Sequence, residues 1–159
     1  MKKAMQTWRR FWRTSGYARG IAIEAACGLL VTRAGLRMAG FRRWKAAIEW
    51  LTPGPARRNA PAGQREIELA QAIARWQAAA ARHLPVETNC LDRALTLWWL
   101  LRRRGIAADL RIGGRKEDGR FEAHAWVEVG EAVLGDASAD RGEFEPFERR
   151  EVSMRTQVS

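Results

Sequence analysis

Cys90 is the residue whose position most favours covalent chemistry. It follows Asn89 in the stretch TNCLDRALTLWWLLRRRG, which reads as one helix, so its side chain belongs to the first helical turn. There a thiolate faces unpaired backbone N–H groups and the positive end of the helix dipole, which favours the nucleophilic form. Because an unpaired cysteine is more often buried and inert, position alone permits two interpretations, a core residue or a nucleophile.

A cysteine nucleophile needs a base, and the chain has two histidines, His83 and His124. His83 lies close to Pro85 at the end of a helical pattern, where a solvated histidine is the ordinary interpretation. His124 lies within an alternating segment, on the face opposite the aliphatic side chains. A histidine there is either exposed on an open sheet face or covered by what packs on that face. The helix that begins at Cys90 is the nearest large apolar element, and if it covers the His124 face it brings the two side chains together.

Asp136 is the candidate for the carboxylate that holds a catalytic imidazole in one tautomer. A two-residue loop at Gly130 and Glu131 would pair Ala125 with Asp136 and turn the acid to the wrong face. An odd loop or a bulge would instead pair His124 with Asp136. A Cys90, His124, Asp136 triad therefore predicts a three-residue loop or a bulge near Gly130, and with a regular two-residue turn Asp136 would lose its role.

The elements around these residues have clear sequence signals. Asn89 is a good N-cap with Asp92 in the capping-box position, and Gly105 suits the left-handed residue after the helix. An Ala-rich helix precedes it, and the apolar period then changes from 3.6 to 2. We expect a helix over 64–83 and strands over 106–114, 120–129 and 132–136, separated by turns at 115–119 and 130–131.

The front of the chain is helical and basic. Residues 1–60 hold 13 basic and 2 acidic residues, a net charge of +11, whereas residues 61–159 hold 15 and 16, a net of −1. Its apolar residues follow helical spacing, and five glycines predict several short helices in place of one long one. Cys27 lies in an apolar helical run without a nearby histidine, so we expect it in the core.

These patterns predict an α+β fold, with a helix headed by cysteine packed on a small antiparallel sheet. We divide the chain into a basic helical N-terminal region (1–51), a Pro/Gly-rich loop (52–63), a catalytic core (64–140) and a polar C-terminal tail (141–159). Two cysteines and two histidines predict neither a disulfide framework nor a metal site, and no cofactor is expected. The apolar run IAIEAACGLLV is broken by Glu24 and lacks a cleavage site, which favours a cytoplasmic protein and leaves open a peripheral membrane contact.

The order Cys, His, Asp, with the cysteine heading a helix, resembles the transglutaminase-like cysteine enzymes, whose papain-like core it shares. The chain more specifically resembles the lasso-peptide biosynthesis B proteins, leader peptidases related to the microcin-processing protease. The segments that carry this resemblance are CLDRALTLWWLLRRRGIAADLRIGG, FEAHAWVEV and VLGD. This resemblance implies that Cys90 is the nucleophile, His124 the base and Asp136 its orienting acid. It implies removal of a leader peptide from a ribosomally made precursor, by hydrolysis of a thioester intermediate.

Fused members of that family carry a β-rich leader-recognition domain, and residues 1–60 lack the alternation to form one. We therefore expect a stand-alone protease half that works with the precursor peptide and a separate recognition protein. The resemblance also implies a separate ATP-dependent cyclase, which fits a chain without a Gly-rich phosphate loop of its own.

Two alternatives stay open. The same residues could transfer the acyl group to an amine, as transglutaminases do. The basic front, with Trp8, Trp12, Trp44 and Trp50, could instead make a non-catalytic protein that binds nucleic acid or an anionic membrane. Tryptophans at helical spacing are more often core residues, and we therefore expect no nucleic acid partner.

Overall fold

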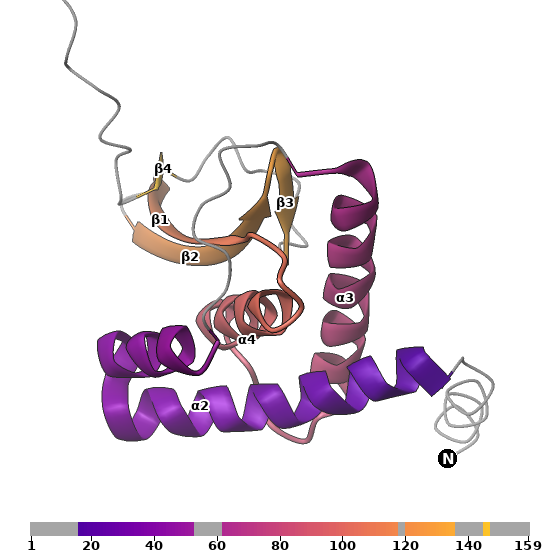
Figure 1. Cartoon of the computed structure of the whole chain (residues 1–159). Coiled ribbons are helices and arrows are strands. Elements are labelled where there is room, and N and C mark those ends of the chain that lie inside the picture. The colour runs from indigo at the N-terminus through magenta and orange to yellow at the C-terminus, as the bar shows by residue number, and fades with distance from the viewer. Residues whose placement is uncertain (1–15, 53–61, 118–119, 136–144, 147–159) are drawn as a thin grey trace, which may run out of the picture.

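The computed structural model describes residues 16–52, 62–117, 120–135 and 145–146. Three helices precede a small sheet (Figure 1): α2 (Gly16–Leu51), α3 (Gln64–His83), α4 (Cys90–Arg102), β1 (Asp109–Glu117), β2 (Arg120–Val129), β3 (Ala132–Leu134) and β4 (Glu145–Pro146). The predicted α+β class is confirmed. The two helices expected from Gln64 and from Cys90 begin at those residues.

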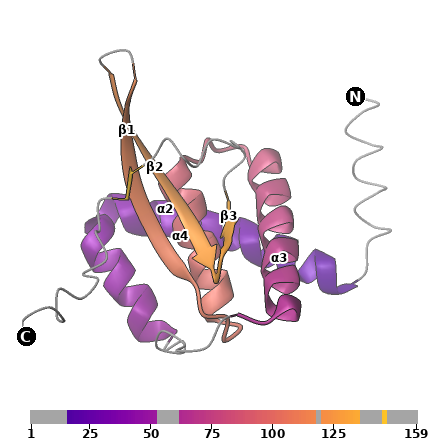
Figure 2. The same ribbon diagram turned by 90° about the horizontal axis from the view of Figure 1, so that it is seen from above.

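The sheet is antiparallel, in the order β3-β2-β1-β4. Its longest pair, β1 and β2, forms a hairpin whose far end extends beyond the helices (Figure 2). β4 pairs Pro146 with Gly113 and Glu145 with Gly114 at the edge of β1. This short strand lies in the segment expected to be a polar tail, and its polar composition gave no sign of it.

α4 is the central element of the core. It lies between the sheet and α2, with α3 alongside (Figures 1 and 2). The buried side chains Leu97, Leu100 and Leu101 of α4 belong to one apolar cluster with residues of both other helices and of β2. Because a single core contains residues from α2 through β3, the helical front packs against the elements that carry the candidate site.

The structure decides which face of the sheet α4 covers. Ala125 and Val127 of β2 are buried in the common core, and their cross-strand partners Ile112 and Leu110 pack against the same cluster. α4 therefore packs on the aliphatic face, whereas His124 lies on the alternate positions. The alternative in which the helix covers the His124 face is wrong, because four aliphatic side chains bury more apolar surface against α4 than a histidine face could.

α2 bends at a single glycine. Gly40 has φ +76° and ψ 168°, a non-helical conformation that only glycine adopts readily, and it divides α2 into two helical segments. The ring of Trp44 lies against Gly35, where a Cβ would come within 2.3 Å of the ring. The expected interruption by glycines thus occurs at Gly40 alone among the glycines within α2.

Cys27 is exposed, so the prediction that it lies in the core is wrong. The most deeply buried apolar side chains of this part of α2 are those of Ile21, Ala25 and Leu29, which follow each other at intervals of four. Cys27 lies midway between Ala25 and Leu29, about 200° around the helix from each. Only one side of α2 faces the core, and Cys27 is on the other.

Candidate active site

The N-terminus of α4 is held by a complete capping box. The Asn89 side chain accepts a hydrogen bond from the Asp92 backbone N–H (2.7 Å), and the Asp92 carboxylate accepts one from the Asn89 N–H (3.2 Å). These two bonds satisfy donors that a helix start otherwise leaves unpaired. The sequence predicted both residues and both roles, and the result is a rigid first turn with Cys90 as its first residue.

Cys90 lies against β2, beside the candidate base. Its Sγ atom is 4.0 Å from the carbonyl oxygen of Ala123, the residue that directly precedes His124. The side chain is half-buried, so the sulfur stays within reach of solvent. Although α4 covers the aliphatic face of the sheet, its first turn thus brings the thiol to the stretch of β2 that holds His124.

His124 is held against an aromatic neighbour. Its ring stacks on that of Trp126 with a centroid separation of 6.3 Å and an interplanar angle of 17°. Trp126 is buried, and its Nε1 donates to Glu128 (3.0 Å), which also accepts from Arg111 of β1 (2.9 Å). This chain of contacts fixes Trp126, and the stacked ring restricts His124. The His124 Nε2 atom is itself buried, which suits a base that works away from bulk water.

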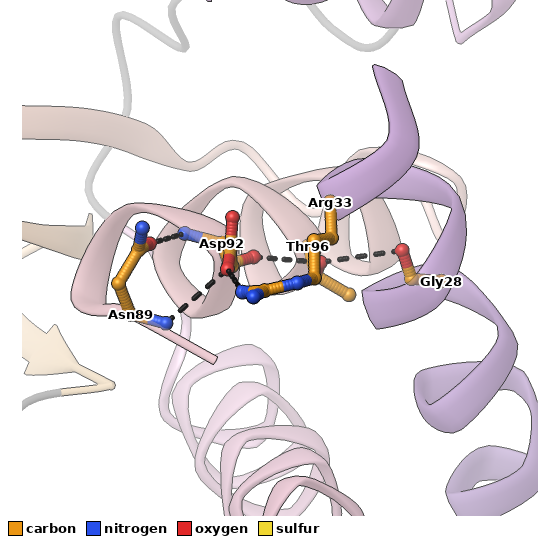
Figure 3. Close-up of polar contacts among 5 residues, drawn as sticks. All are labelled: Gly28, Arg33, Asn89, Asp92 and Thr96. Carbon is orange, nitrogen blue, oxygen red and sulfur yellow. Dashed lines mark hydrogen bonds and ion pairs between the residues drawn. The ribbon is translucent and has the colours of Figure 1, made fainter. Parts of the chain in front are cut away.

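Asp92 also forms an ion pair that sequence reasoning missed. Asp92 is 2% exposed, and its carboxylate lies 3.1 Å from Nη1 of Arg33 on α2. Figure 3 shows this ion pair beside the capping box. Thr96, one turn further, donates to the Asp92 carbonyl oxygen (2.7 Å) and contacts that of Gly28 (3.5 Å). A buried carboxylate needs such a partner. Arg33 and Asp92 are 59 positions apart, and no short-range pattern predicts their contact.

The turn before Asp136 contradicts the sequence expectation. Val129 pairs with Ala132 and Val127 with Leu134, so Gly130 and Glu131 form a regular two-residue loop without a bulge. Gly130 takes the positive φ (+59°) that such tight turns use. β3 ends at Leu134 and Gly135 has φ +85°, so the strand alternation on which the register argument relied stops before Asp136. Asp136 lies outside the described residues, and its role stays a prediction.

Two backbone N–H groups are available near the thiol. The capping box uses the N–H groups of Asn89 and Asp92, whereas those of Cys90 and Leu91 donate to no residue in the described ranges. Both belong to the first turn, where the helix has no carbonyl to offer them. They can therefore stabilise a negative oxygen that develops on a carbonyl attacked by Cys90.

The remaining candidates do not join this site. His83 is exposed at the last position of α3, as expected for a solvated histidine. Trp44 packs against Gly35, while Trp50 is 81% exposed, and Trp8 and Trp12 lie outside the described residues. Across the described ranges, no three His, Cys, Asp or Glu side chains group closely enough to hold a metal ion.

The chain belongs to the transglutaminase-like superfamily. The family model Transglut_core3, described as Transglutaminase-like superfamily, matches residues 28–149, which is most of the chain. The superfamily includes cysteine proteases and acyl transferases. The match begins within α2 and so includes Arg33 as well as the strands. No curated protein and no solved structure matches the chain. None of the described helices has both the length and the apolarity needed to cross a bilayer.

Proposed function

We propose that this member of the transglutaminase-like superfamily is a cysteine peptidase with Cys90 as nucleophile and His124 as base. The observation that carries the proposal is the contact between the Cys90 sulfur and the carbonyl of Ala123, next to His124, at the capped start of α4. A nucleophile at a helix start and a histidine on the adjoining strand form the arrangement that acyl transfer through a thioester requires.

In the proposed mechanism His124 takes the proton of the Cys90 thiol, and the thiolate attacks the carbonyl carbon of a peptide bond. The N–H groups of Cys90 and Leu91 stabilise the oxyanion. His124 then gives its proton to the leaving amine, the C–N bond breaks, and a thioester remains on Cys90. Water, deprotonated by His124, attacks the thioester and releases the carboxylate and the free thiol. Asp136 is proposed to orient the imidazole on the resemblance alone, since the register that would align it with His124 is not the one formed at Gly130.

The proposed substrate is the precursor of a lasso peptide. This assignment rests on the resemblance of the segments around Cys90, His124 and Asp136 to the lasso-peptide biosynthesis B proteins. Cleavage at the junction of leader and core would free the core amine, which a separate cyclase joins to a side-chain carboxylate. We propose a separate leader-recognition protein as the partner that delivers the precursor, and the cytoplasm as the compartment.

Transfer of the acyl group to an amine is the second candidate, because the superfamily includes acyl transferases and the thioester is common to both reactions. The reactions differ in their products. Hydrolysis leaves a free carboxylate on the leader, whereas transfer leaves an adduct between the leader and the amine. Mass spectrometry of the released leader distinguishes them.

The test is incubation of the protein with the precursor peptide encoded beside it, with and without the recognition protein, followed by mass spectrometry. We expect one cut, which Cys90→Ala abolishes. Cys27→Ala is the matched control, because it removes the other cysteine at an exposed position away from β2, and it should cut like the parent. The absence of a cut under every combination, or a cut that survives Cys90→Ala, would contradict the proposal.

A further inference from the structure

A groove of about 640 Å³ adjoins the first turn of α4. We call it the loop groove, because most of its wall comes from the segment between α3 and α4. Its lining includes the apolar side chains of Leu84, Pro85 and Val86, together with Thr88, Glu87 and Arg93. The segment 84–88 leads directly into Asn89 and Cys90, so a peptide whose carbonyl meets the Cys90 sulfur can extend along this groove.

Arg93 is the side chain of this groove that is best placed relative to the thiol. It follows Cys90 by three positions, and residues three apart lie on the same side of a helix. Side chains of a helix lean back toward its N-terminus, so we expect the Arg93 side chain to lie over the turn that carries Cys90. The backbone of Arg93 is fixed, because its carbonyl oxygen accepts a hydrogen bond from Gln77 (3.1 Å), a residue of α3 that is 2% exposed.

The guanidinium of Arg93 has no acidic partner in the described part of the chain. Of the two nearest carboxylates in sequence, Asp92 pairs with Arg33 instead, and Glu87 lines the same groove without an ion pair to Arg93. The Nε atom of Arg93 is buried and makes no hydrogen bond to any described residue. A buried Nε without an acceptor, on a half-buried side chain that lines a groove, favours an acceptor that arrives with a ligand.

We propose that Arg93 binds a carboxylate of the substrate, the side chain of an acidic residue close to the bond that Cys90 attacks. This proposal rests on the proposed function and adds a specificity to it. A guanidinium offers two parallel N–H groups to a carboxylate, a geometry that an amide substrate side chain does not match. The apolar wall formed by Leu84, Pro85 and Val86 lowers the local polarity and strengthens this contact.

The first test needs no peptide. In a Cys27→Ser background, Cys90 is alkylated with iodoacetate and with iodoacetamide, which differ in a carboxylate, and the ratio of the two rates is measured. Arg93→Gln should lower the ratio of the iodoacetate rate to the iodoacetamide rate about fivefold, and the ratio cancels any change in the amount of Cys90 thiolate, because both reagents attack that form. Arg93→Lys should restore part of the loss, because it keeps the charge and loses the paired geometry.

Arg75→Gln is the matched control, since it removes the same charge from an exposed position on α3 outside the groove. An unchanged ratio in Arg93→Gln, or an equal fall in Arg75→Gln, would overturn the proposal. In a precursor that the protein cleaves, each acidic residue is replaced in turn by its amide. One of these replacements should raise the KM of the parent protein and leave the KM of Arg93→Gln unchanged. If Arg93→Gln lost cleavage while its alkylation ratio stayed that of the parent, the proposed role of Arg93 would be contradicted and that of Cys90 would not be affected.

Discussion

The two ends of α4 are both tied to α2, yet they differ in what they leave unsatisfied. At the C-terminal end, Arg103 (2.8 Å) and Arg104 pair with Glu24, and Arg102 donates to the carbonyl of Thr52 (2.7 Å). At the N-terminal end, Asp92 pairs with Arg33 and the Cys90 thiol lies against the Ala123 carbonyl, but the backbone N–H groups of Cys90 and Leu91 donate to no described residue. Arg102 at one end and Arg93 at the other both keep a buried Nε without an acceptor among the described residues, so the two ends differ in the backbone N–H groups left beside Cys90.

The largest expected effect compares the two histidines, the proposed base His124 and the exposed His83. His124→Ala should lower the rate of precursor cleavage about 10³-fold, the usual contribution of a general base. His83→Ala is the matched control, since His83 is exposed at the end of α3, and it should leave the rate unchanged. Mass spectrometry measures the cleavage rate of both variants. A similar fall in rate for His124→Ala and His83→Ala would contradict the role of His124.

The next largest effect compares the ion pairs at the two ends of α4. Asp92→Ala should lower the free energy of unfolding by about 2–4 kcal/mol, because it removes a buried partner of Arg33 and half of the capping box. Glu24→Gln should cost about 1 kcal/mol or less, because the side chains of that cluster are partly exposed. Urea unfolding measures both.

Asp92→Asn refines this comparison, because the amide oxygen still accepts the Asn89 N–H while the charge opposite Arg33 is lost. Asp92→Asn should therefore lower the free energy of unfolding, but by less than Asp92→Ala does. If Glu24→Gln destabilised the protein more than Asp92→Ala, the anchoring of α4 would lie mainly at its C-terminal end, and the account of the capped start would be wrong.

A smaller effect tests the bend of α2, which carries the chain from Arg33 to Thr52. Gly35→Ala should destabilise the protein by about 1–3 kcal/mol, because a Cβ there meets the Trp44 ring at 2.3 Å. Gly20→Ala, where nothing lies within 4 Å, should leave the stability unchanged or raise it by up to about 1 kcal/mol. Thermal or urea unfolding measures both. Equal destabilisation by both variants would contradict the packing described for Trp44.

The sequence predicted the parts of the fold that depend on near neighbours. Asn89, Asp92 and Gly105 lie within or next to α4, and their preferences for cap and turn positions identified both of its ends. The alternation in β2 separated Ala125 and Val127 from His124 and Trp126, because side chains of a strand point to opposite faces. These predictions did not depend on which helices and strands pack against each other.

What the sequence could not predict depends on contacts between distant residues. The Arg33–Asp92 ion pair joins positions 59 apart. Which face of the sheet α4 covers is decided by the burial of aliphatic side chains across several elements, and the sequence alone left that choice open. The exposure of Cys27 follows from which side of α2 meets the core. A longer loop at Gly130 was required only by the pairing of Asp136 with His124, and the actual turn is the ordinary two-residue one.

The most direct test of the central claim compares the two cysteines of the chain. Cys27 is exposed and far in sequence from any histidine, whereas Cys90 is half-buried. If access alone governed reactivity, iodoacetamide would modify Cys27 first. We predict that at neutral pH the parent protein is alkylated at Cys90 at least about tenfold faster than at Cys27, and that His124→Ala removes most of this difference. Faster alkylation of Cys27 in the parent would contradict the assignment of Cys90 as an activated nucleophile.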